Sequence, residues 1–130
     1  MVENGKILLV KRAAEPSKGK WSLPGGSVEW GEPLVKALKR EVREETGLEI
    51  GVEKIAGVFD LIVRETPGVT PHFSLVTHHY IIIDYFAHRT GGILTPGDDA
   101  EDARWVPIEE LDRYGLSNHM RTRLRHMGVM

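Results

Sequence analysis

The sequence predicts a single α/β domain, in which helices cover a β-sheet. Its length of 130 residues favours one domain covering residues 1–130. With 41% hydrophobic and 28% charged residues, the chain has enough apolar side chains to bury a core. Segments with strand-like patterns alternate with segments of helical spacing, and this order favours a sheet covered by helices.

The N-terminal part is expected to form two strands. The apolar run Ile7–Lys11 follows a turn at Gly5 and predicts the first strand. Trp21–Leu23 predicts a shorter one, because Pro24 and the two glycines after it stop a strand.

A helix is expected next, starting at Pro33. Proline suits the first helical position, where an N–H group has no partner within the helix. Apolar residues then recur at i, i+4 and i+8, and Gly47 supplies the C-terminal stop. They are Leu34, Leu38 and Val42.

Three further strands are expected in the second half. Val52–Arg64 and Phe73–Ala87 are rich in Val, Ile, Phe and Tyr, with turn residues Pro67, Gly68 and Pro71 between them. Ala103–Val106 predicts another short strand, after a polar loop.

Two short helices are expected at the C-terminal end. Pro107 begins a helical turn over Ile108–Tyr114, and Ser117 can cap a last helix. Its spacing places three residues inward, Met120, Leu124 and Met127, and leaves three arginines more exposed, Arg121, Arg123 and Arg125.

Composition excludes several classes of function. The chain has no cysteine, which excludes disulfides, thiolate catalysis and cysteine zinc sites. It contains neither an apolar run of the ~20 residues needed to span a membrane nor a secretory signal pattern, so we expect a cytoplasmic protein. A net charge of −2 does not favour binding to nucleic-acid backbones, and no nucleic-acid partner is expected.

Three glutamates of the predicted helix point to metal chemistry. Glu41, Glu44 and Glu45 fall within about 100° of arc on a helix, so they repel one another. A hard divalent cation reverses that repulsion, since Mg²⁺ is commonly held by carboxylates, waters and substrate phosphates. A solvated acidic face is the alternative. Segregation counts against it, because the basic residues of the helix lie largely on another face: Lys36, Lys39, Arg40 and Arg43.

The wider pattern from Gly26 to Leu48 resembles the signature of the Nudix hydrolase family. Gly26 is followed after five residues by Glu32, and after seven more by the run from Arg40 to Leu48. A chance match at a given start is on the order of 10⁻¹⁰, with each fixed residue at ~7% background. The early strand, its Lys20–Gly26 lead-in and the late acidic segment 98–107 also resemble the family. The resemblance implies an α/β/α sandwich around a mixed β-sheet.

The resemblance also implies roles for the residues of this signature, here called the box (Gly26 to Leu48). Glu41, Glu44 and Glu45 would bind Mg²⁺ or Mn²⁺, with the Gly25 carbonyl as a further ligand. Arg40 would hold the carboxylates in place, and Glu32 would support it. Gly26 and Gly47 would serve the backbone geometry. The metals would neutralise phosphate charge and activate a water.

The general base is left open. In the family it is either a box glutamate, here Glu41, or an acidic residue of the late loop. Asp98, Asp99 and Glu101 are the loop candidates, and Glu101 is preferred slightly over Glu41. Such loop carboxylates are also common as solvated turn residues.

A few further residues are candidates for binding substrate. Arg12 and Arg64 could reach phosphates, and Trp30 could stack on a base, whereas Trp21 is expected to pack. Clustered histidines suggest a metal site, but His78 and His79 point to opposite faces of a strand, so surface or packing roles are preferred. The others of this group are His72 and His88.

The predicted function is metal-dependent hydrolysis of a pyrophosphate bond in a nucleoside diphosphate derivative, with an ADP-ribose-like molecule as first choice. The alternatives are a (deoxy)nucleoside triphosphate pyrophosphohydrolase and a non-catalytic nucleotide-binding regulator. RNA decapping would need a basic surface along which the RNA binds, and only the C-terminal arginines could provide one.

A homodimer is predicted from the strands. Members of the family usually have a further strand before the one at Ile7–Lys11, and only a few residues precede Gly5 here. Open edges of Ile7–Lys11 or Phe73–Ala87 would then invite pairing with a second copy. Basic residues at Lys11 and Arg12 could instead protect the edge and keep the chain monomeric.

Overall fold

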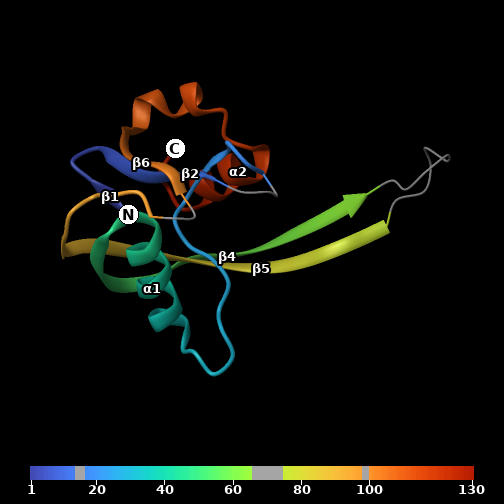
Figure 1. Cartoon of the computed structure of the whole chain (residues 1–130). Helices are drawn as coiled ribbons and strands as arrows, with labels where there is room; N and C mark the ends of the chain where they lie inside the picture. The colour runs from blue at the N-terminus through green and yellow to red at the C-terminus, as the bar shows by residue number, and fades with distance from the viewer. Residues whose placement is uncertain (14–16, 66–74, 98–99) are drawn as a thin grey trace.

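The computed structural model describes residues 1–13, 17–65, 75–97 and 100–130. It contains two antiparallel sheets, two α-helices and one 3-10 helix (Figure 1). In chain order the elements are β1 (Val2–Glu3), β2 (Lys6–Arg12), β3 (Trp21–Ser22), α1 (Leu34–Thr46), β4 (Leu48–Glu65), β5 (Leu75–Gly92), β6 (Ala100–Pro107), η1 (Ile108–Tyr114) and α2 (Asn118–His126). No helix in these parts of the chain is both long and apolar enough to cross a membrane.

β2 is the central strand of the first sheet. β6 pairs along its whole length, while β1 and β3 pair with its two ends. The expectation of an open edge at Ile7–Lys11 is therefore wrong. The residues before Gly5 form a two-residue strand that pairs with β2, with Val2 opposite Ile7.

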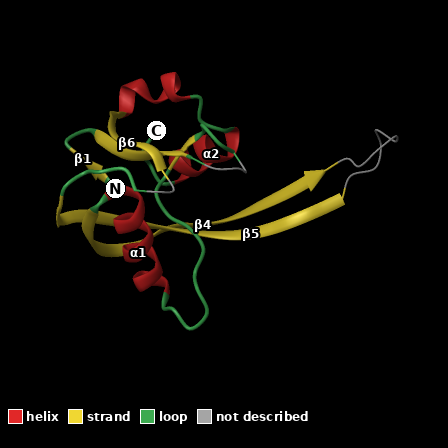
Figure 2. Ribbon diagram, in the orientation of Figure 1, coloured by secondary structure: helices red, strands yellow, loops and turns green. Residues whose placement is uncertain are grey.

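Alternating side chains of β2 build two cores on opposite faces of this sheet. Ile7 and Leu9 belong to a cluster with residues of η1 and α2, whereas Leu8 packs with Val42 of α1 and Leu48 of β4. Helices therefore cover both faces, which confirms the expected α/β/α layering (Figure 2). The strand pairs of both described sheets are antiparallel.

β4 and β5 form a separate two-stranded ribbon, longer than predicted in the sequence. The strands run over Leu48–Glu65 and Leu75–Gly92, whereas Val52–Arg64 and Phe73–Ala87 were expected. Their inner ends lie beside α1, and their outer ends extend away from the rest of the molecule (Figure 1). Glycines at 51, 91 and 92 lie in these strands beyond the expected ranges, which explains why a turn-based interpretation made the strands too short.

Helix α1 begins one residue later than expected. Pro33 precedes it in an extended conformation, with ψ of 148°, and accepts the first backbone hydrogen bond from Ala37. Gly47 ends it as expected, with a left-handed φ of 74°. Its buried side chains include Ala37 and Val42, whereas Leu34 of the predicted apolar stripe is exposed.

Helix α2 has the predicted cap, since the Met120 amide donates to Ser117 Oγ at 3.1 Å. The expectation that Arg123 is exposed is wrong. Arg123 is 7% exposed and donates two hydrogen bonds, of 2.9 and 2.7 Å, to Asp84 of β5. Position 123 lies three residues after Met120, so it faces inward, and the ion pair compensates the buried charge.

Candidate active site

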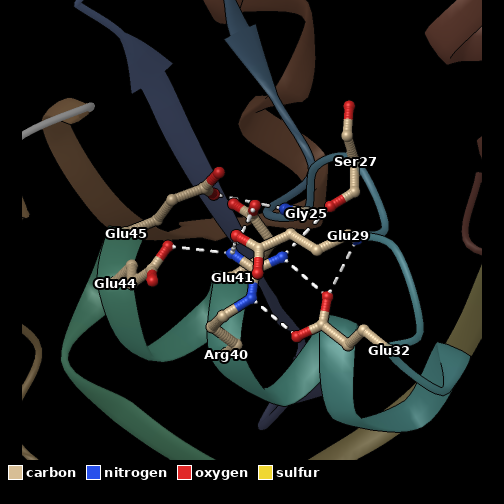
Figure 3. A network of polar contacts seen from close by, with 8 residues as sticks. All are labelled: Gly25, Ser27, Glu29, Glu32, Arg40, Glu41, Glu44 and Glu45. Atoms are coloured by element: carbon tan, nitrogen blue, oxygen red, sulfur yellow. Dashed lines mark hydrogen bonds and ion pairs between the residues drawn. The ribbon is translucent and has the colours of Figure 1, made fainter.

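The box glutamates of α1 gather around one arginine, Arg40 (Figure 3). Arg40 Nη1 donates to Glu41 Oε1 at 2.9 Å and to Glu44 Oε2 at 3.2 Å. Arg40 and Glu44 are four residues apart and so lie on one side of the helix, whereas Glu41 is the adjacent residue, contacted by the same Nη1. Arg40 thus contacts two of the three predicted metal ligands.

The other nitrogens of Arg40 contact the loop before the helix. Nε and Nη2 donate to the two carboxylate oxygens of Glu32 at 2.8 and 3.0 Å, and Nη2 also donates to the Ser27 carbonyl at 3.1 Å. The hydrogen bonds from Arg40 lower the pKa of Glu32 and, reciprocally, raise the pKa of Arg40. This bidentate pair links the loop to α1, which is the supporting role expected of Glu32.

Glu45, the third glutamate, is held from the other side by Gly25. The Gly25 amide donates to Glu45 Oε2 at 3.2 Å, so the backbone of Gly25 lies beside this carboxylate. Gly25 has a φ of 151°, which other residues rarely adopt. Of the four predicted metal-binding residues, Gly25 thus lies beside Glu45, whereas Glu41 and Glu44 share contacts with Arg40.

Gly26 leaves room for Glu41. A Cβ atom at Gly26 would lie 2.5 to 2.7 Å from the carboxylate atoms of Glu41. Close approach, and not a special backbone angle, therefore explains a glycine at this position of the box.

A late loop docks on the C-terminal end of α1. The Thr95 amide donates to the Thr46 carbonyl at 2.7 Å, and the Gly97 amide donates to the Glu45 carbonyl at 3.0 Å. These bonds satisfy carbonyls that a helix end leaves unpaired. A Cβ at Gly97 would collide with the Glu44 carbonyl oxygen, so only glycine fits. Sequence reasoning missed Gly97, because its partner lies more than fifty residues earlier.

The candidate base Glu101 lies four residues after Gly97, near the start of β6. Residues 98 and 99, which include two of the loop candidates, Asp98 and Asp99, lie outside the described residues. Glu101 is the extra residue where the β2–β6 register shifts, since Lys11 pairs with Asp102 and Arg12 with Ala100. Its carboxylate lies 3.6 Å from Lys11 Nζ and is half exposed.

The donor set of the site fits a hard divalent cation. Arg40 contacts Glu41 and Glu44, and Glu45 contacts the Gly25 amide, so these three carboxylates outnumber the one arginine and leave excess negative charge. Oxygen atoms are the ligands that Mg²⁺ and Mn²⁺ prefer. Within the described ranges, no three histidine, aspartate or glutamate side chains converge as they stand into a metal cluster. Arg40 and the Gly25 amide contact the carboxylate oxygens, so binding an ion requires these side chains to turn.

The candidate substrate residues lie in different places. Arg12 ends β2, and its backbone bonds hold the segment of Gly19 and Lys20. Trp30 is fully exposed in the loop before α1. Arg64 pairs with Val76 near the outer end of β4, so it is not brought to the α1 carboxylates (Figure 1).

Other residues singled out in the sequence have packing or surface contacts. Trp21 packs edge-on against Tyr114, with centroids 5.1 Å apart, as expected of a packing residue. His79 pairs with Asp60 at 2.7 Å, and the neighbouring His78 stacks on Tyr80. His72 lies outside the described residues.

Comparisons with known proteins agree on one family. The model described as NUDIX domain matches residues 1–127. The chain is 38% identical over 116 residues to the ADP-ribose pyrophosphatase of Methanocaldococcus jannaschii, covering 89% of this chain and 63% of that protein. It therefore spans less than two thirds of that relative's length.

Two further matches extend over nearly the whole chain. The nucleoside triphosphatase NudI of Enterobacter sp. (strain 638) is 32% identical over 133 residues, covering 98% of this chain and 91% of that protein. The crystal structure of a MutT NUDIX hydrolase from Burkholderia pseudomallei aligns with a TM-score of 0.75 at 30% identity, covering 97% of this chain and 91% of that one.

Proposed function

This chain belongs to the NUDIX domain family, and from that premise we propose that it is an enzyme that hydrolyses a pyrophosphate bond in a nucleoside diphosphate derivative. The observation that carries the proposal is the complete network around Arg40, in which every glutamate of the box is present and oriented by a hydrogen bond. A nucleotide-binding module without activity would not need three carboxylates at one helix face, which repel one another unless cations are bound.

Mg²⁺ or Mn²⁺ is the proposed cofactor. Bound at Glu41, Glu44, Glu45 and the Gly25 carbonyl, it would neutralise phosphate charge and lower the pKa of a bound water. If Glu41 and Glu44 turned from Arg40 to a cation, Arg40 would lose only the contacts of its Nη1. Its bidentate pair with Glu32 would remain, so the arginine would still have a partner. Glu101 or Glu41 would take the proton of the attacking water.

ADP-ribose is the first substrate we propose. The support is the similarity to the archaeal ADP-ribose pyrophosphatase, at 38% identity. The second candidate is a nucleoside triphosphate, supported by the similarity to NudI across almost the full length of both chains. RNA decapping loses support, because one of the three C-terminal arginines that could bind RNA, Arg123, is buried in an ion pair with Asp84. The homodimer and the cytoplasmic location stay predictions.

A substrate panel tests the proposal. ADP-ribose, UDP-sugars, (deoxy)nucleoside triphosphates and 5′-triphosphorylated RNA are each incubated with Mg²⁺ or Mn²⁺, and the released nucleotide is identified by chromatography. We expect AMP and ribose 5-phosphate from ADP-ribose as the fastest reaction. A nucleoside monophosphate and pyrophosphate from a triphosphate would favour the second candidate.

A matched control variant distinguishes activity of this site from activity of a contaminating enzyme. Glu45→Gln should abolish the released product, whereas Glu49→Gln changes an exposed glutamate just outside the box and should leave it intact. No turnover of any compound in either metal, by folded protein, would contradict the proposed activity.

A further inference from the structure

A small pocket lies where the first sheet meets the inner end of β5. Its volume is about 240 Å³. The residues that line it come from four strands and the turn between β1 and β2, and they are Glu3, Asn4, Lys6, Arg89 and Trp105. β1 contacts β5 here, so the pocket joins the two sheets (Figure 1).

The pocket is separate from the candidate active site, since no residue of the box lines it. Lys6 begins β2, whereas Lys11, which contacts Glu101, lies near the other end of this strand. Five residues of a strand span roughly 17 Å, at about 3.3 Å per residue. A ligand small enough for the pocket therefore does not reach the candidate base.

The charges of the pocket favour an anion. The Lys6 ammonium makes no hydrogen bond or ion pair with any residue in the described parts of the chain. Arg89 Nη2 lies 3.5 Å from Glu3 Oε2, which is beyond the usual length of a hydrogen bond. Two cations thus line the pocket with one carboxylate, in a protein whose net charge is −2. An anion between Lys6 and Arg89 would relieve their mutual repulsion.

These two cations supply the donors that a phosphate group needs. A guanidinium presents five N–H donors in a planar fork, and an ammonium presents three. The Arg89 side chain is 45% exposed, and Lys6 is also exposed. Both can therefore turn to a ligand without leaving a buried charge behind.

Trp105 gives the pocket an apolar wall with a polar tip. The ring packs against the core cluster of Leu8, Val42 and Leu48. Its indole N–H makes no hydrogen bond with the residues that the structure describes, and no buried side-chain nitrogen among them lacks a partner, so this donor is open to solvent. An aromatic ring with a free N–H suits the C–H face and a hydroxyl group of a sugar.

We infer that this pocket is an accessory binding site for a small sugar phosphate. The phosphate contacts Lys6 and Arg89, and the sugar lies against Trp105, with its hydroxyl groups near the Glu3 carboxylate and the Asn4 amide. The pocket is smaller than the about 300–1,000 Å³ of sites that enclose drug-sized ligands, so it suits a phosphate with one small ring and not a dinucleotide. This inference does not depend on the proposed hydrolysis.

Calorimetric titration with ribose 5-phosphate tests the inference. EDTA is present throughout, so that metal ions at the box cannot contribute to binding. We expect saturable binding that is at least ~10-fold tighter than that of inorganic phosphate, because the sugar adds hydrogen bonds, and no saturable binding of ribose. Binding should weaken as salt is added, since the charges of an open pocket are screened.

Two variants remove the phosphate donors one at a time. Lys6→Met and Arg89→Met should each weaken the binding of ribose 5-phosphate by at least ~10-fold, because each removes a charged donor. Lys36→Met is the matched control, since Lys36 is an exposed lysine on α1, and this variant should bind as the wild type does. Circular dichroism checks that all three variants are folded.

Tryptophan fluorescence gives a second readout, which reports the place of binding. Ribose 5-phosphate should change the emission of the wild type, and Trp105→Phe should remove this change. Trp30→Phe is the control, because Trp30 is fully exposed in the loop before α1, and it should keep the change.

Four outcomes would each overturn the inference. They are the absence of saturable binding, equal affinity for inorganic phosphate, binding that is unchanged in both Lys6→Met and Arg89→Met, and a fluorescence change that persists in Trp105→Phe.

Discussion

Arg40 divides its hydrogen bonds between residues that we expect to bind metal and a residue that only supports them. Nη1 contacts Glu41 and Glu44, whereas Nε and Nη2 contact Glu32. Glu41 and Glu44 can exchange the arginine for a cation without unfolding the loop, because the Glu32 pair remains. This division should make the expected metal ligands separable from the supporting part of the network by mutation.

The first prediction concerns Glu44 and Glu45. Glu44→Gln and Glu45→Gln should each lower turnover by at least ~10²-fold, because each removes a charged ligand from the cation site. Helix content by circular dichroism should be unchanged, since losing a carboxylate relieves like-charge repulsion. Full activity of either variant at saturating metal would refute their assignment as ligands.

The general base is predicted to be Glu101. If so, the acid limb of the pH–rate profile, which reports its deprotonation, should disappear in Glu101→Gln and persist in Glu41→Gln. The measurement is kcat/KM across pH 4 to 9 for both variants. The reverse result would assign the base to Glu41.

Gly26→Ala tests the close approach of Gly26 to Glu41. The added Cβ would lie 2.5 Å from the Glu41 carboxylate carbon, so that side chain must move away from Arg40. We expect at least ~10-fold weaker Mn²⁺ binding by electron paramagnetic resonance, with little change in melting temperature, because a displaced side chain can point to solvent.

Gly91→Ala is its control. The Cβ there meets only Glu49 Cβ, at 4.0 Å, which is ordinary contact. Equal loss of Mn²⁺ affinity in both variants would contradict a specific role for Gly26.

Between elements, the contact of α2 with β5 depends on one buried ion pair. Arg123 is 9% and Asp84 12% exposed in their side chains, and the guanidinium also lies 5.9 Å from the Phe59 ring centroid. The two residues are 39 positions apart, so their pairing is a property of the packed elements.

Arg123→Met should lower the free energy of unfolding by about 3 kcal/mol, because it leaves the Asp84 charge buried without a partner. Urea unfolding measures this loss. The double variant Arg123→Met, Asp84→Leu removes both charges and should recover a large part of it. A double variant as unstable as the sum of the two single variants would show that the pair is not coupled.

At the scale of the whole molecule, cation binding should stabilise the fold. A ligand present at a hundred times its dissociation constant adds about 2.7 kcal/mol to the free energy of unfolding when the unfolded chain does not bind it. We therefore expect the melting temperature to rise on adding Mn²⁺, and to rise less in Glu45→Gln. An equal rise in both proteins would place the binding elsewhere.

Much of the site could be predicted from the sequence, because it depends on local geometry. Glu41, Glu44 and Glu45 share a side of one helix as a consequence of its 3.6-residue period, and Glu32 reaches Arg40 across only eight positions. The cap at Ser117 and the stop at Gly47 are local for the same reason.

The sequence by itself thus determined the fold class, the family and the carboxylate face of α1. Only the tertiary structure decided that β2 is covered on both edges, that Arg123 is buried on Asp84, and that the loop at Gly97 docks on the end of α1. It also decided that Arg64 lies on the outer part of a ribbon, away from the predicted metal ligands. The physical reason is distance along the chain: periodicity and caps act within a few residues, whereas these contacts join segments that meet only when the chain packs.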